Sequence, residues 1–548
     1  MCLNMTDGRK ADLIILGNVI TMDDRKPSAE AVAVKGDRIL YVGAAEVAKK
    51  LCDADTKVYD FGTNTIYPGF LEAHCHPGGA GYMSIGVAQL QREADYEANV
   101  RIVKEYIDAN PDIEDIHGYG FTVLEEKPTA AMLDAICADK PIDLTDLNGH
   151  SMWLNTAALK KYGIDRSAVE KWGTDCVEVD ENGDPTGYIA ENPVFHVRAH
   201  STVGVDILKK SLLMWQDFAL SMGYTGVYNA GVNITSDNEA LAYHALEKEG
   251  LLKHYTFAGR MMDDNTETPE EDIDKLAAEA AEHNSRHYRI IGAKTFCDGT
   301  VEAHTAWMID DYRDQPGYKG ISRFDDPDKI VRLVRACEKH GLNVHVHAIG
   351  NQANKLWAEC FAQVEEETGN FDMRNAIAHL QCVEPEVVRR IGEYNIIPVA
   401  GMLWVMLSEG ERRQTDDYIG PKWTKRCYPI KDFLDAGAAL CSHSDFPVSP
   451  AFTAPGTICL GVSGKNPSLD DSFIRHPDQH ISRMDAMKAI TTNVAYSWHQ
   501  EHEMGSLEIG KLANITVFDS DFLRDDLAEV ETAKCLATFV DGELVYKA

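Results

Sequence analysis

The fold is decided by the stretch Tyr67-Pro68-Gly69-Phe70-Leu71-Glu72-Ala73-His74-Cys75-His76. An apolar run leads into two histidines that are separated by one residue. On an extended strand, alternate side chains point to the same side, so both imidazoles face one direction and Cys75 faces the other. Two imidazoles on one side of a strand can bind one metal ion. The stretch therefore predicts a buried strand that leads into a metal site.

Eight strand-like runs are separated by connections, several of which have the apolar spacing of amphipathic helices. The segment 328–338 has this spacing and precedes Gly341, a residue type that commonly ends helices. Alternating strands and helices are typical of a parallel barrel, so we predict an α/β fold, a (β/α)8 TIM barrel. The predicted barrel strands are 66–74, 225–229, 255–260, 290–296, 342–347, 376–380, 396–400 and 438–444.

The two ends of the chain contain similar patterns of strands and turns. Strand-like runs flank Gly36-Asp37 near the start and Asp541-Gly542 near the end. So few strands cannot bury a core at each end, and we expect them to combine. About 150 residues separate the first two barrel strands, many more than a crossover needs, which predicts an insertion. The predicted domains are a β-sandwich of residues 1–65 and 505–548, a barrel of residues 66–504, and a cap at roughly 90–210 within the barrel.

Composition excludes several classes of partner. The formal net charge of −34 makes nucleic acid and anionic membranes poor partners. No apolar stretch reaches the roughly 20 residues of a spanning helix, and residues 1–7 do not resemble a signal peptide. The 13 cysteines contain no Cys-x-x-Cys and fit reduced thiols. We therefore expect a cytoplasmic protein, a homodimer, that acts on a small molecule.

Four later residues complete a candidate metal centre. Lys294, His347, His379 and Asp445 each lie in or directly after a strand-like run. In a (β/α)8 barrel, the carboxyl ends of the strands and the loops that follow build the active site. Histidine and carboxylate ligands suit zinc, with nickel, iron or manganese as alternatives. The predicted metal ligands are His74, His76, Lys294, His347, His379 and Asp445.

The lysine determines which chemistry this centre supports. An ammonium group beside metal cations would be repelled, so Lys294 must be neutral or chemically altered. Carboxylation of its amine by carbon dioxide gives a carbamate, an anion that can bridge two zinc ions. Two such ions can share a hydroxide at neutral pH. Asp445 would then act as general base and acid, moving a proton from the nucleophile to the leaving nitrogen.

These motifs resemble the amidohydrolase superfamily, and within it the YtcJ-like branch that includes N-substituted formamide deformylase. The resemblance covers nearly the whole chain. It implies the ligand set given above, a carboxylated Lys294, and hydrolysis of carbon–nitrogen bonds other than peptide bonds in amides, N-formyl groups or cyclic amides. The motifs that carry it are Pro68-Gly69-Phe70-Leu71, Gly149-His150-Ser151, Lys294-Thr295-Phe296-Cys297-Asp298-Gly299, His347-Ala348-Ile349-Gly350, Ala378-His379-Leu380-Gln381 and Ser444-Asp445-Phe446-Pro447-Val448.

Departures from the branch concern the substrate. Asn351 stands where the branch usually has Asp, and Glu302-Ala303-His304-Thr305-Ala306 stands where it often has Gly-Ser-Arg-Thr-Ala. A histidine in place of that arginine predicts a substrate with different polar groups. The candidate substrate contacts are His150, His304 and Gln381.

Two roles and two functions stay open at this point. His345 and His443 lie two residues before His347 and Asp445, so strand alternation places them on the same inward side. Each is either a hydrogen-bonded histidine of the barrel interior, or a residue that contacts substrate or a metal ligand.

The alternative activities are a deaminase of an amidine-type heterocycle and, in another class, a catalytically inactive barrel that binds or regulates. A lysine on the fourth strand favours the amide hydrolase over the deaminase.

Overall fold

The computed structural model describes residues 10–548 except 86, 93, 112, 148, 201–202, 234–237, 406–414, 450–451 and 466–476. The chain divides into two compact units. One contains residues 1–75, 216–230 and 247–548, and the other contains residues 76–215 and 231–246. Among the described residues, no helix combines the length and the apolar character needed to cross a bilayer.

The first unit is built around an eight-stranded parallel sheet in which each strand pairs with its neighbours in chain order. Its strands are largely buried on both faces, as expected for a parallel sheet covered by helices. Leu71, Phe257, Val399 and Trp498 belong to the core packed around the sheet. The predicted α/β fold and (β/α)8 barrel are confirmed. The strands are β5 (Phe70–Cys75), β12 (Tyr224–Val232), β13 (Tyr255–Met261), β14 (Tyr288–Phe296), β15 (Asn343–Ala348), β16 (Ala376–His379), β17 (Ile397–Ala400) and β18 (Cys441–Ser442).

Helices connect the barrel strands. Helix α11 (Pro327–Lys339) corresponds to the predicted segment 328–338. Its first turn is capped by Asp326, whose side chain accepts hydrogen bonds from Asp328 N and Lys329 N. The others are α8 (Val205–Ser221), α9 (Glu239–Lys248), α10 (Pro269–His283), α12 (Asn351–Thr368), α13 (Pro385–Glu393), α15 (Pro421–Thr424), α16 (Ile430–Asp435), α17 (Ala454–Ser463), α18 (Arg483–Lys488) and α19 (Thr492–Ser497), with short 3₁₀ turns η1 (Met402–Val405) and η2 (Pro477–Gln479).

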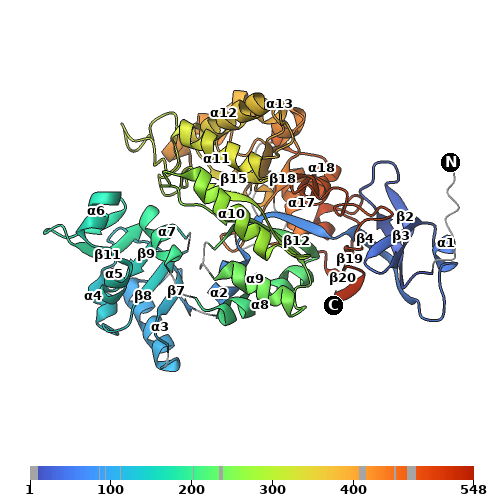
Figure 1. Cartoon of the computed structure of the whole chain (residues 1–548), viewed down its shortest axis with the longest axis horizontal. Helices are drawn as coiled ribbons and strands as arrows, with labels where there is room; N and C mark the ends of the chain where they lie inside the picture. The colour runs from blue at the N-terminus through green and yellow to red at the C-terminus, as the bar shows by residue number, and fades with distance from the viewer. Residues whose placement is uncertain are drawn as a thin grey trace. The chain divides into compact units, whose positions relative to one another are not determined.

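Strands from both ends of the chain share one seven-stranded sheet. Figure 1 shows blue β4 beside red β19, and these strands pair in antiparallel register from Ile515 opposite Pro68 to Phe518 opposite Thr65. Alternating side chains bury one face in a core that includes Ile15, while the other face packs on α1 (Ala45–Lys49). The strands are β1 (Leu13–Ile20), β2 (Ser28–Lys35), β3 (Arg38–Gly43), β4 (Lys57–Pro68), β19 (Ile515–Phe518), β20 (Cys535–Val540) and β21 (Glu543–Lys547); α20 (Leu527–Glu531) lies between β19 and β20.

The second unit has its own sheet of six strands and its own core, which includes Phe121, Leu144 and Trp153. This unit contains the segment in which the sequence predicts an insertion. Its strands are β6 (Ala88–Gln89), β7 (Ile116–Phe121), β8 (Ile142–Asp146), β9 (Ser151–Leu154), β10 (Val177–Val179) and β11 (Pro185–Ala190). Its helices include α2 (Pro77–Ile85), α3 (Tyr96–Ala109), α4 (Ala130–Asp134), α5 (Thr156–Tyr162), α6 (Arg166–Trp172) and α7 (Asn192–Ala199).

One predicted strand is two strands in the structure. The run 66–74 is divided at Gly69, with β4 ending at Pro68 and β5 beginning at Phe70. A Cβ atom at Gly69 would lie 2.1 Å from Oγ1 of Thr225, so only glycine allows this close approach. The sequence shows one continuous apolar run over 66–74 because β4 and β5 are both buried there, although the two strands belong to different sheets.

Candidate metal centre

Three of the predicted ligands meet at the carboxyl ends of the barrel strands. His74 on β5, His379 on β16 and Asp445 after β18 are buried, and each offers a ligand atom within 4.8 Å of the others. Nε2 of His74 lies 3.1 Å from Oδ1 of Asp445. His379 and Asp445 have φ angles of 77° and 57°, so the backbone turns sharply at both strand ends. Two imidazoles and a carboxylate at this spacing are a donor set suited to a divalent cation.

His379 and His347 form the second part of this cluster. Their ring centroids are 4.4 Å apart, and His379 is stacked on Trp404 at 4.9 Å. Burial, assisted by His347, lowers the pKa of His379 well below its ordinary value, so the ring is neutral. Nδ1 of His379 has no hydrogen-bond partner among the described residues. Nε2 of His347 lies 3.2 Å from the carbonyl oxygen of Gly299.

Lys294 is buried on β14. The described residues contain no hydrogen-bond acceptor for Nζ, which lies 4.4 Å from the centre of the Phe296 ring. Burial lowers the pKa of Lys294 to about 7, although Asp445 acts in the opposite direction. A large share of the amine is therefore neutral near neutral pH, which is the form that reacts with carbon dioxide.

Glu72 joins the first and last strands of the barrel. Its Oε1 accepts hydrogen bonds from His74 N at 3.1 Å and from Ser444 N at 2.9 Å. The amide of Asp445 donates to the carbonyl oxygen of His74 at 3.0 Å. Burial raises the pKa of Glu72 to about 8. The sequence analysis missed this residue, although its position two residues before His74 places it on the same side of β5.

Asp298 is a second residue that the sequence analysis did not single out as functional. One carboxylate oxygen accepts from Ile349 N at 3.0 Å, and the other accepts from Gly350 N at 2.7 Å and from Trp307 N at 2.9 Å. Three backbone amides therefore hold the loop after β15 against the loop after β14. The first of these loops directly follows His347, so Asp298 fixes the position of this predicted ligand.

The remaining predicted ligand and one substrate contact belong to the other compact unit. His76 directly follows β5, is half-buried, and its carbonyl oxygen accepts from Ala80 N. Nδ1 of His150 lies 3.2 Å from a carboxylate oxygen of Glu191. Glu191 is buried and has a φ of 57°, a strained conformation for a glutamate.

The two other predicted substrate contacts lie in the barrel unit. Nε2 of His304 is 2.8 Å from Oδ2 of Asp314, and its ring lies 4.0 Å from the ring of Tyr418. Gln381 is buried two residues after His379, and its Nε2 has no hydrogen-bond partner within the described part of the chain. Asn351, a departure from the branch, accepts a hydrogen bond from Ile309 N through its side-chain oxygen at 2.8 Å, so it has a structural contact.

His345 and His443, whose roles the sequence does not decide, both lie in the cluster. Nε2 of His345 is 2.8 Å from Nδ1 of His74. The ring centroid of His443 is 4.9 Å from that of His379 and 5.1 Å from that of Trp404. Both are buried. The cluster therefore contains more imidazoles than the predicted ligand set requires.

Comparison with known proteins agrees with this fold. The chain is 26% identical to Protein LONG AFTER FAR-RED 3 of Arabidopsis thaliana over 98% of this chain and 92% of that protein. It is 25% identical to N-substituted formamide deformylase of Arthrobacter pascens, over 98% of each chain. The crystal structure of an uncharacterized metal-dependent hydrolase from Pyrococcus horikoshii OT3 has the same fold, with a TM-score of 0.75, 22% identity, and coverage of 94% of this chain and 99% of that one.

A match to a whole family provides the assignment. The sequence profile described as the Amidohydrolase family matches residues 57–546, which include the barrel strands and all six predicted ligands. The resemblance inferred from the motifs is confirmed. This chain belongs to the amidohydrolase family.

Proposed function

We propose that this protein is a metal-dependent hydrolase of carbon–nitrogen bonds in a small molecule that contains an amide, an N-formyl group or a cyclic amide. The observation that carries this proposal is the cluster of His74, His379 and Asp445, with ligand atoms within 4.8 Å of one another. The buried amine of Lys294 supports it, because an amine with no acceptor among the described residues needs another reason to be buried.

The residues present fit a pair of zinc ions. His74, His347, His379 and Asp445 would hold the metal, carboxylated Lys294 would supply a further anionic ligand, and His76 remains a ligand proposed from the sequence. Neutral imidazoles are good zinc ligands, and burial keeps His379 neutral by lowering its pKa. When bound, such ions polarise a carbonyl group and lower the pKa of a water molecule toward about 7.

Asp445 is the proposed general base and acid. Its backbone amide is fixed by the carbonyl oxygen of His74, and its carboxylate points to Nε2 of the same residue. A carboxylate in this position accepts a proton from the attacking water and delivers it to the nitrogen as the carbon–nitrogen bond breaks. The proton transfer belongs to the transition state, so its loss lowers the turnover rate more than substrate binding.

Substrate selection is proposed to depend on Gln381 and His304 in the barrel unit, while His150 of the other unit remains a candidate from the sequence. The side-chain amide of Gln381 can donate to a substrate carbonyl, because its Nε2 has no protein partner among the described residues. His304 is held by Asp314 at 2.8 Å, which makes it a donor of fixed orientation rather than the anion-binding arginine common in the branch. These differences favour a substrate whose polar groups differ from those common in the branch.

The test is a substrate screen on enzyme prepared in two states. Metal-free protein, and protein reloaded with zinc and bicarbonate, would be assayed with N-formyl, N-acyl and cyclic amide compounds, with release of the amine or ring-opened product as the readout. The proposal expects turnover only in the reloaded sample. Equal turnover in both samples would overturn the metal requirement. Ammonia release from amidine heterocycles, with no hydrolysis of amides, would support the deaminase instead.

A further inference from the structure

His345 contacts a predicted metal ligand directly. It lies on β15, where its backbone is paired with Lys294 of β14 and Ala376 of β16. Its Nε2 is 2.8 Å from Nδ1 of His74. Its ring is stacked on Tyr228, with centroids 4.6 Å apart and planes 18° apart. The ring is therefore packed through its face and bonded through its edge.

The direction of the hydrogen bond between these two imidazoles depends on where their protons lie. Such a bond needs one N–H group and one nitrogen lone pair. A metal ion binds an imidazole through a lone pair, and the nitrogen of His74 that faces Asp445 is Nε2, at 3.1 Å. When Nε2 is the ligand atom, the proton of His74 must be on Nδ1. Nδ1 then donates to Nε2 of His345, which carries its own proton on Nδ1.

We infer, resting on the metal centre proposed above, that His345 is a positioning residue that holds His74 in the tautomer able to bind metal. Without metal, the same pair supports the opposite arrangement. Nε2 of His345 then donates to Nδ1 of His74, and the proton of His74 lies on Nε2, which faces Oδ1 of Asp445 at 3.1 Å. Metal binding reverses the hydrogen bond between the two rings. Each ring carries one proton in both arrangements, so the pair gains and loses no net proton.

A neutral imidazole is suited to this role because its Nε2 can either donate or accept. An ionised carboxylate, a frequent partner of metal-bound histidine, only accepts and would favour one tautomer whether or not metal is bound. The stack on Tyr228 fixes the plane of the ring in both arrangements, because moving a proton within the ring changes no packing contact. Once metal occupies Nε2 of His74, only the arrangement in which His345 accepts remains, so replacing His345 by an apolar residue removes this acceptor from the buried Nδ1–H of His74 and weakens the metal-bound form.

Two substitutions separate the hydrogen bond from the packing. His345→Phe keeps an aromatic ring against Tyr228 but removes both nitrogens. His345→Gln loses the stacked ring but keeps a side-chain amide that can accept or donate. His254→Phe is a matched control, because His254 is a buried histidine at the amino end of β13 whose ring is hydrogen-bonded to Gln216 and Thr256.

The experiment measures the zinc dissociation constant of each metal-free protein by competition with a chromogenic chelator, and the visible spectrum of each protein loaded with Co²⁺. His345→Phe is expected to weaken zinc binding by about 10- to 100-fold and to alter the cobalt bands. His345→Gln is expected to stay within roughly 5-fold of the wild type, since an amide can replace the hydrogen bond. His254→Phe is expected to match the wild type. Thermal unfolding of the metal-free proteins monitors the fold.

Three outcomes would contradict the inference. Wild-type affinity and an unchanged cobalt spectrum in His345→Phe would overturn it alone, leaving the proposed function intact. Equal losses in His345→Gln and His345→Phe would show that packing, not the hydrogen bond, is what matters. A wild-type protein that binds no zinc would overturn the proposed function and this inference together.

Discussion

The backbone amide of Asp445 donates a hydrogen bond of 3.0 Å to the carbonyl oxygen of His74. This bond joins the first strand of the barrel to the residues that follow the last one. It brings together two predicted metal ligands that are far apart in sequence. Glu72 strengthens the same connection by accepting hydrogen bonds from His74 N and Ser444 N. Closure of the barrel and assembly of the metal centre are therefore one structural event.

Glu72→Ala is expected to lower the free energy of unfolding of the metal-free protein by about 1–3 kcal/mol, because it leaves two buried amides without their acceptor. Glu72→Gln keeps the side-chain oxygen and is expected to lose less. Urea unfolding of the metal-free proteins measures both. Equal stability of the alanine variant and the wild type would show that the carboxyl group does not hold the two strands together.

Lys294→Ala is expected to lose most activity and part of the bound metal, because the bridging carbamate is lost. Short carboxylic acids or bicarbonate are expected to restore part of the activity by supplying an anion to the space left by the side chain. The measurements are turnover and metal content with and without these acids. An active wild-type enzyme whose Lys294 is shown by mass spectrometry to be unmodified would contradict the proposed role.

Asp445→Asn is expected to keep the fold and at least one metal ion but to lower turnover by about 100-fold or more, because an amide cannot carry the proton. The loss should appear in kcat rather than in KM. Steady-state kinetics on the substrate found by the screen measures it. Turnover within a few-fold of the wild type would remove Asp445 from the proton transfer.

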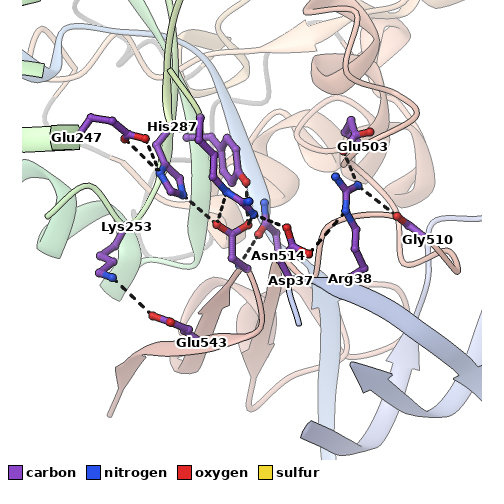
Figure 2. Close-up of polar contacts among 12 residues, drawn as sticks. Asp37, Arg38, Glu247, Lys253, His287, Glu503, Gly510, Asn514 and Glu543 are labelled. Atoms are coloured by element: carbon purple, nitrogen blue, oxygen red, sulfur yellow. Dashed lines mark hydrogen bonds and ion pairs between the residues drawn. The ribbon is translucent and has the colours of Figure 1, made fainter. Parts of the chain in front are cut away.

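The ion pair between His287 and Asp541 predicts that the stability of the protein depends on pH. Figure 2 shows His287 between Glu247 and the C-terminal hairpin; its Nε2 lies 2.9 Å from Oδ2 of Asp541. Although burial opposes charge on the ring, hydrogen bonds to Asp541 and Glu247 raise the pKa of His287 to about 9. The pKa of Asp541 is lowered to about 2 by His287 and Arg286, against the effect of burial.

These two pKa shifts determine how the contribution of each residue to stability changes with pH. The contribution of His287 is complete below its ordinary pKa of 6.5 and is lost as pH rises through about 9. The contribution of Asp541 is complete above 3.8 and is lost only as pH falls through about 2. His287→Gln should therefore cost about 1–3 kcal/mol of unfolding free energy near pH 6 and much less near pH 10. A cost that is the same at both pH values would contradict a charged His287.

The strands and site residues that could be predicted from the sequence are those marked by a pattern within a short segment. The apolar runs before His74 and His347 identify parallel strands, and alternation along a strand places His345 and His443 on the inner side. The strand over 438–444 was predicted too long, since only Cys441–Ser442 form β18. The residues after β18 are joined to β5 by Glu72 and by the backbone hydrogen bond from Asp445 to His74, which no local sequence pattern indicates.

The unpredicted parts depend on contacts between distant segments. Glu72 acts on Ser444, 372 residues away, and His345 acts on His74, 271 residues away. The division of the run 66–74 at Gly69 depends on the close approach of Thr225. In each case the partner belongs to a distant segment, so only the assembled barrel shows which residue it contacts.

The metal content of the purified protein tests the central claim most directly. Protein prepared with zinc and bicarbonate, freed of excess metal and measured by elemental analysis beside Lys294→Ala, should contain about two zinc ions per chain, with fewer in the variant. One ion per chain in both proteins would contradict the bridging role of Lys294. No bound metal in the wild type, even after reloading, would contradict the metal centre itself.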